Sequence, residues 1–291
     1  MNKNFYKNLI IVLLMIVTIP AGAAGIRDEI FYLDRDNKLQ LVTSHFAQLK
    51  PTAVPELVEI LKVSLANKPL KTISGKYPVS AIAQGELILK LAEFADPRAK
   101  NIVIAYLKRS TDRFNREVAA VSLGSFGDPA VIPLLRESLR DRDPVLQLYA
   151  ARSLGELKDT SGYETALKYL HSEDKTLKIQ SMYALAMIGK TEAVPLLQEI
   201  KKDTAYRDAA TLAEKKISYD HLAAVEKSRF LDEIIKTNTG EVAYWAASEY
   251  VKLGAEYLAS LRKMAEDKSY KGRESVADIL KEKDLAVPAK K

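Results

Sequence analysis

Gly189-Lys190-Thr191 is one segment of the sequence that could form a reactive site. These residues match the end of the phosphate-binding loop motif, in which a lysine and a hydroxyl follow a glycine-rich turn around a phosphate. The motif also requires a glycine five residues before Gly189, and Ala184 occupies that position. Because the backbone amides cannot curl around a phosphate without that glycine, the segment is predicted to be a turn between two helices.

The residues that could bind a metal ion are scattered along the chain. A helical zinc site needs two histidines four residues apart, and no histidine of this chain has such a neighbour. The three histidines are His45, His171 and His221. Asp34, Asp36 and Asn37 begin like a calcium loop, but the glycine and the final glutamate of that loop do not follow. We therefore predict no metal site.

Residues for nucleophilic or acid–base catalysis are equally isolated. The chain has no cysteine, which excludes disulfides, thiolate metal sites and cysteine nucleophiles. Ser125 lies between glycines, but their spacing is not that of a nucleophile elbow. Carboxylates such as Asp141 and Asp143 fall between predicted helices, where helix capping explains them. The sequence therefore predicts no catalytic residue and no cofactor.

An internal repeat organises most of the chain. Four similar segments follow one another at offsets of 32, 31 and 31 residues, and a fifth lies two periods further on. The segments are 91–107, 123–135, 154–170, 185–197 and 250–264. A fixed period of this length indicates stacked structural units. We predict an all-α fold, an α-solenoid (superhelix) of about seven helix pairs, with a degenerate copy over 206–236.

Each unit is predicted to contain two helices. In one unit, apolar residues recur at helical spacing from Ala130 to Leu139, and Asp143-Pro144 opens a second helix that runs to about Leu157. Leu154, matched in other units by Leu123 and Leu185, is expected in the core. Glycines near the helix ends are expected to adopt the left-handed conformation that ends a helix. These glycines are Gly124, Gly127, Gly155, Gly189 and Gly254. The first pair is expected over 53–66 and 79–94, with a long loop over 67–78 between its helices.

The repeat resembles the short HEAT-like repeats first associated with phycobilisome lyases. The resemblance rests on the pattern L-G-x-x-G-D-P-x-x-x-P-L-L. The residues that carry the pattern are Leu123, Gly124, Gly127, Asp128, Pro129, Pro133, Leu134 and Leu135. It covers residues 79–202 well and 205–282 more loosely. The resemblance implies a platform whose second helices line a concave face, and it suggests a lyase-type enzyme as one possible activity.

One side of the predicted second helices forms a candidate binding surface, which we name the ridge. The ridge consists of Leu148, Arg152, Ile179, Tyr183 and Tyr244. Arginine, tyrosine and apolar side chains are enriched where proteins bind one another most tightly. Packing between neighbouring units is the alternative role for the same residues.

The N-terminal residues have the pattern of a signal peptide. Lys3 and Lys7 precede 19 residues without a charge, 8–26, and small residues surround Ala23. We expect cleavage after Ala23 or Ala24, and therefore an exported protein in the periplasm or outside the cell. An uncleaved membrane anchor is the alternative, since about 20 apolar residues can span a bilayer.

The predicted organisation is a signal peptide (1–23), an N-terminal helical cap (24–52), a HEAT-like array (53–282) and a disordered basic tail (283–291). Without Lys3 and Lys7, 42 basic residues face 38 acidic ones, so the formal charge is +4. So small a charge favours neither nucleic acid nor anionic lipid. The leading hypothesis is a non-enzymatic scaffold that binds a protein or peptide along the concave face. The alternatives are an enzyme on the same fold and a nucleic-acid binder.

Overall fold

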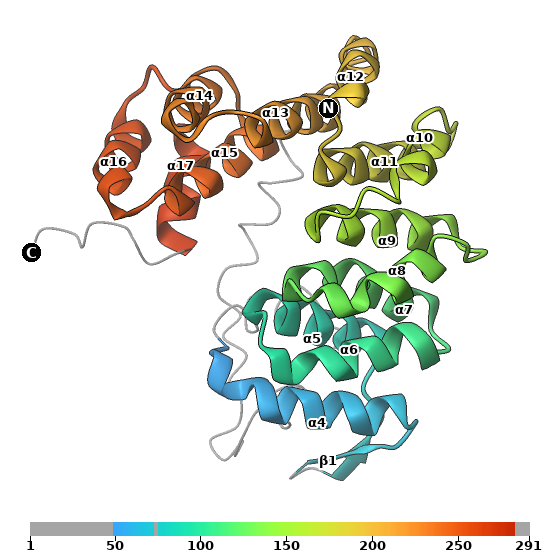
Figure 1. Ribbon diagram of the computed structural model, residues 1–291. Coiled ribbons are helices and arrows are strands. Elements are labelled where there is room, and N and C mark those ends of the chain that lie inside the picture. Colours follow the sequence, from blue (N-terminus) through green and yellow to red (C-terminus); the bar gives the residue numbers. More distant parts are fainter. Residues whose placement is uncertain (1–48, 73–74, 283–291) are drawn as a thin grey trace, which may run out of the picture. The chain divides into compact units, whose positions relative to one another are not determined.

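The computed structural model describes residues 49–72 and 75–282. Three predicted segments lie outside the described residues: the signal peptide with its cleavage site at Ala23, residues 24–48 of the cap, and the tail over 283–291. Fourteen α-helices, α4 to α17, make up most of the described part (Figure 1). They follow one another as seven helix pairs, which confirms the predicted all-α repeat fold of the α-solenoid type. None of the described helices is long and apolar enough to cross a membrane.

The part of the chain that the structure describes divides into two compact units, with the boundary between Ala119 and Ala120. In the first unit, α4 packs against both α5 and α6. The expected loop between α4 and α5 contains two short antiparallel strands in which Leu70 pairs with Tyr77. The elements of this unit are η1 (Pro51–Ala53), α4 (Val54–Leu65), β1 (Leu70–Thr72), β2 (Gly75–Tyr77), α5 (Ala81–Phe94), α6 (Pro97–Arg109) and α7 (Arg113–Ser122). The boundary between the units falls within α7, after Ala119.

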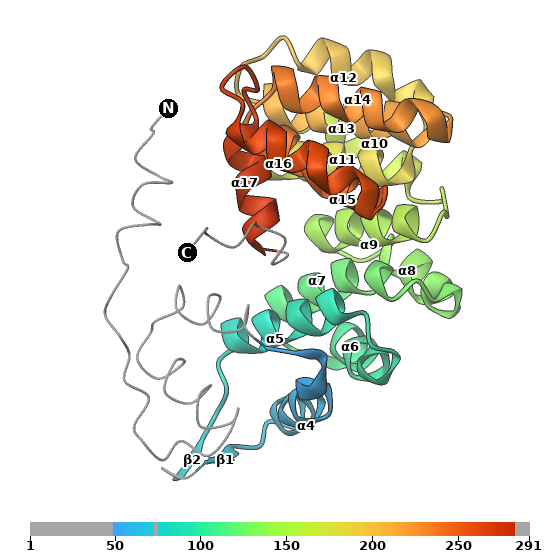
Figure 2. The same ribbon diagram turned by 90° about the vertical axis from the view of Figure 1, so that its left-hand side faces the viewer.

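The second unit contains five helix pairs. Its first helices are α8 (Ile132–Ser138), α10 (Tyr163–Leu170), α12 (Val194–Ile200), α14 (Ala224–Thr237) and α16 (Leu258–Glu266). Its second helices are α9 (Pro144–Glu156), α11 (Lys175–Ile188), α13 (Arg207–Asp220), α15 (Gly240–Lys252) and α17 (Arg273–Glu282). Each second helix packs against the next, in the order α9, α11, α13, α15 and α17. Figures 1 and 2 both show α11 directly beside α9. The second helices therefore form one continuous row.

The predicted Asp-Pro pairs begin helices as expected. The carboxylate of Asp143 accepts a hydrogen bond of 3.0 Å from the backbone N–H of Val145, at the start of α9. Asp128 does the same for Ala130 at 2.9 Å. Each bond satisfies one of the amides that a helix leaves unpaired in its first turn, and the following proline has no amide to satisfy.

Only three of the five glycines that were expected to end helices have a positive φ: Gly127, Gly189 and Gly254. The prediction is wrong for Gly124 and Gly155. A Cβ atom on Gly155 would lie 2.5 Å from the backbone nitrogen of Ile188 in α11. The residue is therefore a glycine because two helix backbones meet there, and not because α9 needs a left-handed end.

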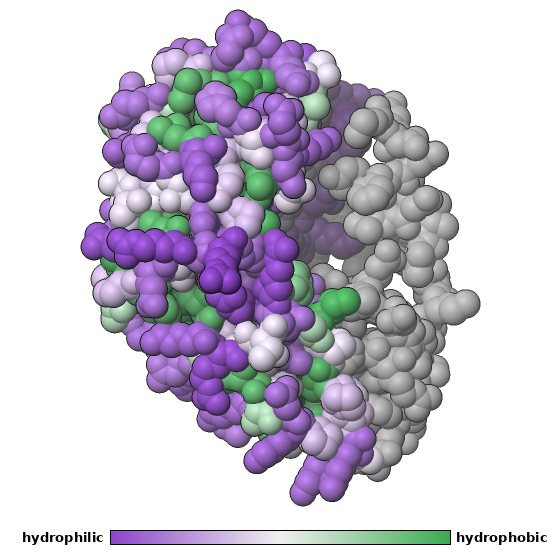
Figure 3. Space-filling view, turned by 90° about the vertical axis from the view of Figure 1, so that its right-hand side faces the viewer, coloured by the Kyte–Doolittle hydropathy of each residue, from purple (hydrophilic) through white to green (hydrophobic). Residues whose placement is uncertain are grey.

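The core of the second unit lies within and beneath the row of second helices. Leu123, Leu154 and Leu185 are fully buried, which confirms the predicted core position of the repeat. Small side chains follow the contacts between second helices, and Ala150, Ala151, Ala246 and Ala247 are all fully buried. Hydrophilic residues dominate the face shown in Figure 3 and separate the hydrophobic ones into small patches.

Candidate functional site

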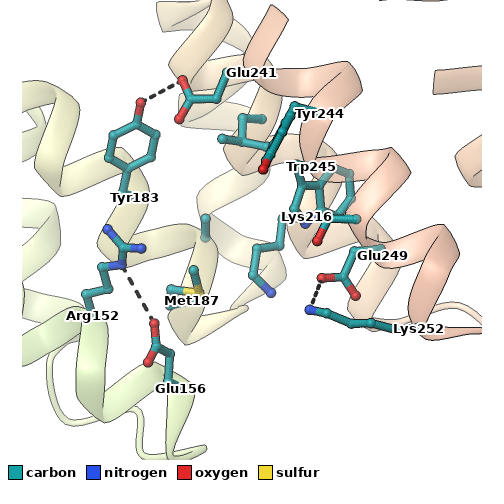
Figure 4. A pocket seen from close by; sticks show the side chains of 13 residues that line it. Arg152, Glu156, Tyr183, Met187, Lys216, Glu241, Tyr244, Trp245, Glu249 and Lys252 are labelled. Carbon is teal, nitrogen blue, oxygen red and sulfur yellow. Dashed lines mark hydrogen bonds and ion pairs between the residues drawn. The ribbon is translucent and has the colours of Figure 1, made fainter. Parts of the chain in front are cut away.

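A cavity of about 490 Å³ opens on the row of second helices in the second unit (Figure 4). Residues of α9, α11, α13 and α15 line it, and we name it the second-helix groove. Its volume lies in the range of sites that bind small molecules or peptide side chains, about 300 to 1,000 Å³.

Helical periodicity explains how each helix contributes to the second-helix groove. Residues four apart lie on one face of a helix, one turn above the other. Three helices each contribute such a pair: Arg152 and Glu156 from α9, Tyr183 and Met187 from α11, and Leu212 and Lys216 from α13. The fourth helix, α15, contributes Glu241, Tyr244, Trp245, Ser248, Glu249 and Lys252, which repeat over three turns. The row of helices places these four faces side by side.

Three of the five predicted ridge residues line the second-helix groove: Arg152, Tyr183 and Tyr244. The prediction of a surface role is wrong for Leu148, which is fully buried and packs in one core cluster with Met182 and Leu185 of α11. Ile179 is partly buried against the same cluster and does not line the cavity. Leu148 and Arg152 are therefore one turn apart on α9, the first in the core shared with α11 and the second at the groove.

Arg152 has unused hydrogen-bonding capacity. Its Nε is buried and has no hydrogen-bond partner among the residues that the structure describes. Its nearest acidic oxygen, Oε1 of Glu156, is 3.8 Å away, which is too long for a hydrogen bond. About a third of the side chain is exposed to solvent. The guanidinium can therefore donate to a group that enters the groove.

Burial raises the pKa of Glu156 above its usual range. The charges of Arg152, Lys216 and Lys252 act in the opposite direction and lower the same pKa. All three cations line the groove together with this carboxyl group. Glu156 is therefore an acid whose ionised form is poorly solvated and depends on neighbouring cations.

The two tyrosines of the groove use their hydroxyls within the protein. Tyr183 donates a hydrogen bond of 2.9 Å to Oε2 of Glu241, and Tyr244 donates to Oε2 of Glu282. Burial, and then the carboxylate it contacts, raises the pKa of each phenol, to about 12 for Tyr244. Both tyrosines therefore remain protonated at neutral pH, and each presents its ring to a ligand more readily than its hydroxyl.

Sequence reasoning missed several groove residues, among them Glu156, Met187, Lys216 and Trp245. Glu156 and Met187 follow Arg152 and Tyr183 by four residues, so extending the ridge by one helical turn would have found them. Lys216 lies in α13, within the degenerate copy, where the repeat no longer gives a register. Trp245 packs edge-on against Tyr219, with ring centroids 5.7 Å apart.

The motifs considered for chemistry have structural roles where the structure describes them. Gly189-Lys190-Thr191 forms the predicted turn between α11 and the 3-10 helix Thr191–Ala193. The Nδ1 of His221 lies 2.9 Å from the backbone carbonyl oxygen of Ile217. Over residues 49–72 and 75–282, His, Asp and Glu side chains form no group of three that could hold a metal ion. Asp34, Asp36, Asn37 and His45 lie outside the described residues.

Comparison with known families agrees with this architecture. The family model of HEAT repeats matches residues 80–147 and, again, residues 136–215. Together the two matches extend over residues 80–215. They include α9, α11 and the part of α13 that contains Leu212, and thus three of the four helices of the groove. The helix pairs α14–α15 and α16–α17 continue the array beyond the matched repeats.

One solved structure that is similar to this chain is the complex of CpcE and CpcF of phycocyanin lyase from Nostoc sp. PCC7120. The two chains are 20% identical, and the TM-score is 0.44. The similarity covers 78% of this chain and 94% of the other. No curated protein sequence matches this chain.

Proposed function

We propose that the protein is an exported, non-enzymatic scaffold that binds a protein or peptide partner in the second-helix groove. The observation that carries the proposal is the groove itself. Four successive second helices line it, and it offers a guanidinium whose Nε is without a partner in the described part of the chain, beside three aromatic rings. Arginine, tyrosine and tryptophan are the residues on which protein–protein binding energy most often depends.

The shape of the groove also supports a peptide ligand. Helices that pack side by side lie about 8–10 Å apart, so a surface that crosses four of them is long enough for an extended segment. An extended chain covers about 3.3 Å per residue. About seven to nine residues of a partner could therefore follow the row of second helices.

Site-specific crosslinking tests the proposal in the host cell. A photoreactive amino acid placed at Ser248, which lines the groove, should crosslink to a discrete polypeptide. The same amino acid at Glu137, an exposed position on α8, is the control and should not. The double variant Arg152→Ala with Tyr183→Ala should lose the product, at a cost of about 1–4 kcal/mol of binding energy, and remain folded. Loss of melting temperature with an unchanged crosslink would assign both residues to packing.

Export is tested on the same material. Intact-mass measurement of protein recovered from its host should show the loss of residues 1–23 or 1–24, because the charge-free stretch ends in a signal-peptidase site. Recovery of the full chain from detergent-solubilised membranes would support an anchor instead.

A DNA-binding assay tests the nucleic-acid alternative. Retention of the protein on DNA that disappears as salt is raised would favour that alternative.

An enzyme is the second candidate, because Glu156 is an acid with a raised pKa inside a cavity, as acid–base catalysts are. The crosslinked partner decides between the two functions. A covalent change in that partner that occurs with the parent protein and not with Glu156→Gln would favour an enzyme. An unmodified partner that binds both proteins would favour the scaffold.

A further inference from the structure

The cations of the second-helix groove come from three different helices and share one cavity. Arg152 belongs to α9, Lys216 to α13 and Lys252 to α15. Figure 4 shows the three side chains extending into the same space, with Glu156 on the side of α9. The charges of all three act on that one carboxyl group. The tertiary structure thus gathers cations that are 64 and 36 residues apart in the sequence.

The three cations differ in how fully the protein already satisfies them. The Nζ of Lys252 lies 2.7 Å from Oε1 of Glu249, and the Nζ of Lys216 lies 3.1 Å from Oδ2 of Asp220. Within residues 49–72 and 75–282, the Nε of Arg152 has an ion pair with Glu156 at 3.8 Å and makes no hydrogen bond. An oxyanion that enters the groove would therefore find its best donor at Arg152, with two lysines close enough to add favourable charge.

Apolar side chains lie next to the cations. Met187 of α11, Leu212 of α13 and Trp245 of α15 line the same cavity. The hydroxyls of Tyr183 and Tyr244 are already bonded to Glu241 and Glu282. A ligand is therefore recognised by charge at one position and by apolar contact at the next, which suits alternating side chains of an extended peptide.

This inference rests on the proposed function. We propose that the segment bound in the second-helix groove is acidic: an aspartate or glutamate side chain binds Arg152 on the side that faces Lys216 and Lys252, and a neighbouring apolar side chain packs on Met187, Leu212 and Trp245.

The carboxylates of the groove argue against a nucleic-acid ligand. Glu156, Glu241 and Glu249 line the cavity together with the three cations. A polyphosphate backbone places a charge on every nucleotide and would meet these carboxylates, whereas a peptide can place one carboxylate at the cations and neutral groups elsewhere. A basic peptide fits less well, since Glu241 and Glu249 already have partners in Tyr183 and Lys252.

A library of random decapeptides displayed on phage tests the proposal with the purified full chain. Selection on the parent protein should enrich sequences with aspartate or glutamate beside an apolar residue. Selection on the triple variant Arg152→Gln, Lys216→Gln, Lys252→Gln should lose the acidic enrichment. The matched control is Arg140→Gln, Lys175→Gln, Lys202→Gln, which removes three exposed cations of the same unit outside the groove. It should select the same acidic sequences as the parent.

Affinity measurements on one selected peptide give the magnitude. Replacing its glutamates by glutamine should weaken binding about tenfold, because a charge-assisted hydrogen bond to a guanidinium is lost. Glu156→Gln should strengthen binding of the acidic peptide, because it removes the carboxylate that competes for Arg152. Raising the salt from about 0.1 M to about 1 M should weaken binding, since the screening length falls from about 10 Å to about 3 Å.

The outcomes separate this inference from the proposed function. Selected peptides without acidic residues, or acidic peptides that bind the triple variant as well as the parent, would overturn the inference and leave a peptide-binding groove. If no peptide is selected and no partner is crosslinked at Ser248, both proposals fail. Loss of binding in the control variant would show a response to net charge alone and would also overturn the inference.

Discussion

The substitution Gly155→Ala tests the close approach of α9 and α11. In an open helix, replacing glycine by alanine stabilises a protein, because alanine is favoured by about 1 kcal/mol in helix propensity. Gly155 is helical and buried, so helix propensity alone would predict a gain of that size. The structure predicts the opposite sign. The added Cβ would lie 2.5 Å from both the carbonyl carbon of Met187 and the amide nitrogen of Ile188.

The magnitude follows from that distance. Non-bonded carbon atoms pack at about 3.5–4.0 Å, so the backbones of α9 and α11 would have to separate by about 1 Å. These are main-chain atoms, which cannot rotate away as the end of a side chain can. Inserting a methyl group into a packed contact costs about 1–3 kcal/mol. Because the clash is with backbone atoms, we take the upper part of that range, about 2–3 kcal/mol, and after the propensity gain of about 1 kcal/mol we expect Gly155→Ala to destabilise the second unit by about 1–2 kcal/mol.

Gly85→Ala is the matched control within the chain. Its added Cβ would also lie 2.5 Å from a neighbouring atom, but that atom belongs to the ring of Phe114, which is 42% exposed and can turn, and the next neighbour, Oδ1 of the buried Asn115 at 3.3 Å, need shift by only a few tenths of an ångström. We expect Gly85→Ala to leave stability unchanged, or to raise it by up to about 1 kcal/mol.

Urea unfolding of the two variants and the parent measures both effects. Far-ultraviolet circular dichroism follows the whole array, and the fluorescence of Trp245, the chain's single tryptophan, reports on the second unit. If Gly155→Ala is as stable as the parent, or more stable, α9 and α11 do not meet as closely as the structure shows. The reasoning would also be refuted if both glycine variants lost stability equally.

Two further predictions concern stability. Leu154→Asp should lower the free energy of unfolding by more than about 3 kcal/mol, because it places an unpaired carboxylate at a fully buried core position. A melting temperature within a degree or two of the parent would show that the register of the second helices is wrong. Asp96 caps the start of α6, and hydrogen bonds from the side chain and backbone N–H of Arg98 lower the pKa of its carboxyl group to about 2. The ionised cap therefore contributes its full stabilisation above the usual aspartate pKa of about 3.9. This contribution is lost as the pH falls through about 2. Asp96→Ala should therefore have a lower urea midpoint than the parent at pH 7, and the difference should shrink below about pH 4; a constant difference down to about pH 2 would contradict the assignment.

The sequence determined the features that depend on residues close together along the chain. The Asp-Pro pairs at 128–129 and 143–144 begin helices because a cap needs only the residues of one turn. Leu154 is a core residue because a repeat presents the same position to the same environment in each unit. The period of about 31 residues likewise predicted the all-α repeat fold and the number of helix pairs.

Only the tertiary structure decided which residues of the second helices are covered and which face the groove. Leu148 and Arg152 are four residues apart on α9, and sequence spacing gave them the same role. Packing of α11 over α9 buries the first and leaves the second at the cavity. The same contact explains why residue 155 is a glycine: the backbone of α11 leaves no room for a Cβ atom there, and the end of α9 does not require a glycine. In α13 the repeat gave no register, so Lys216 became part of the site only when the helices were placed side by side. These outcomes depend on the distance and angle between helices about one repeat apart, and the pattern within one helix carries no information on either.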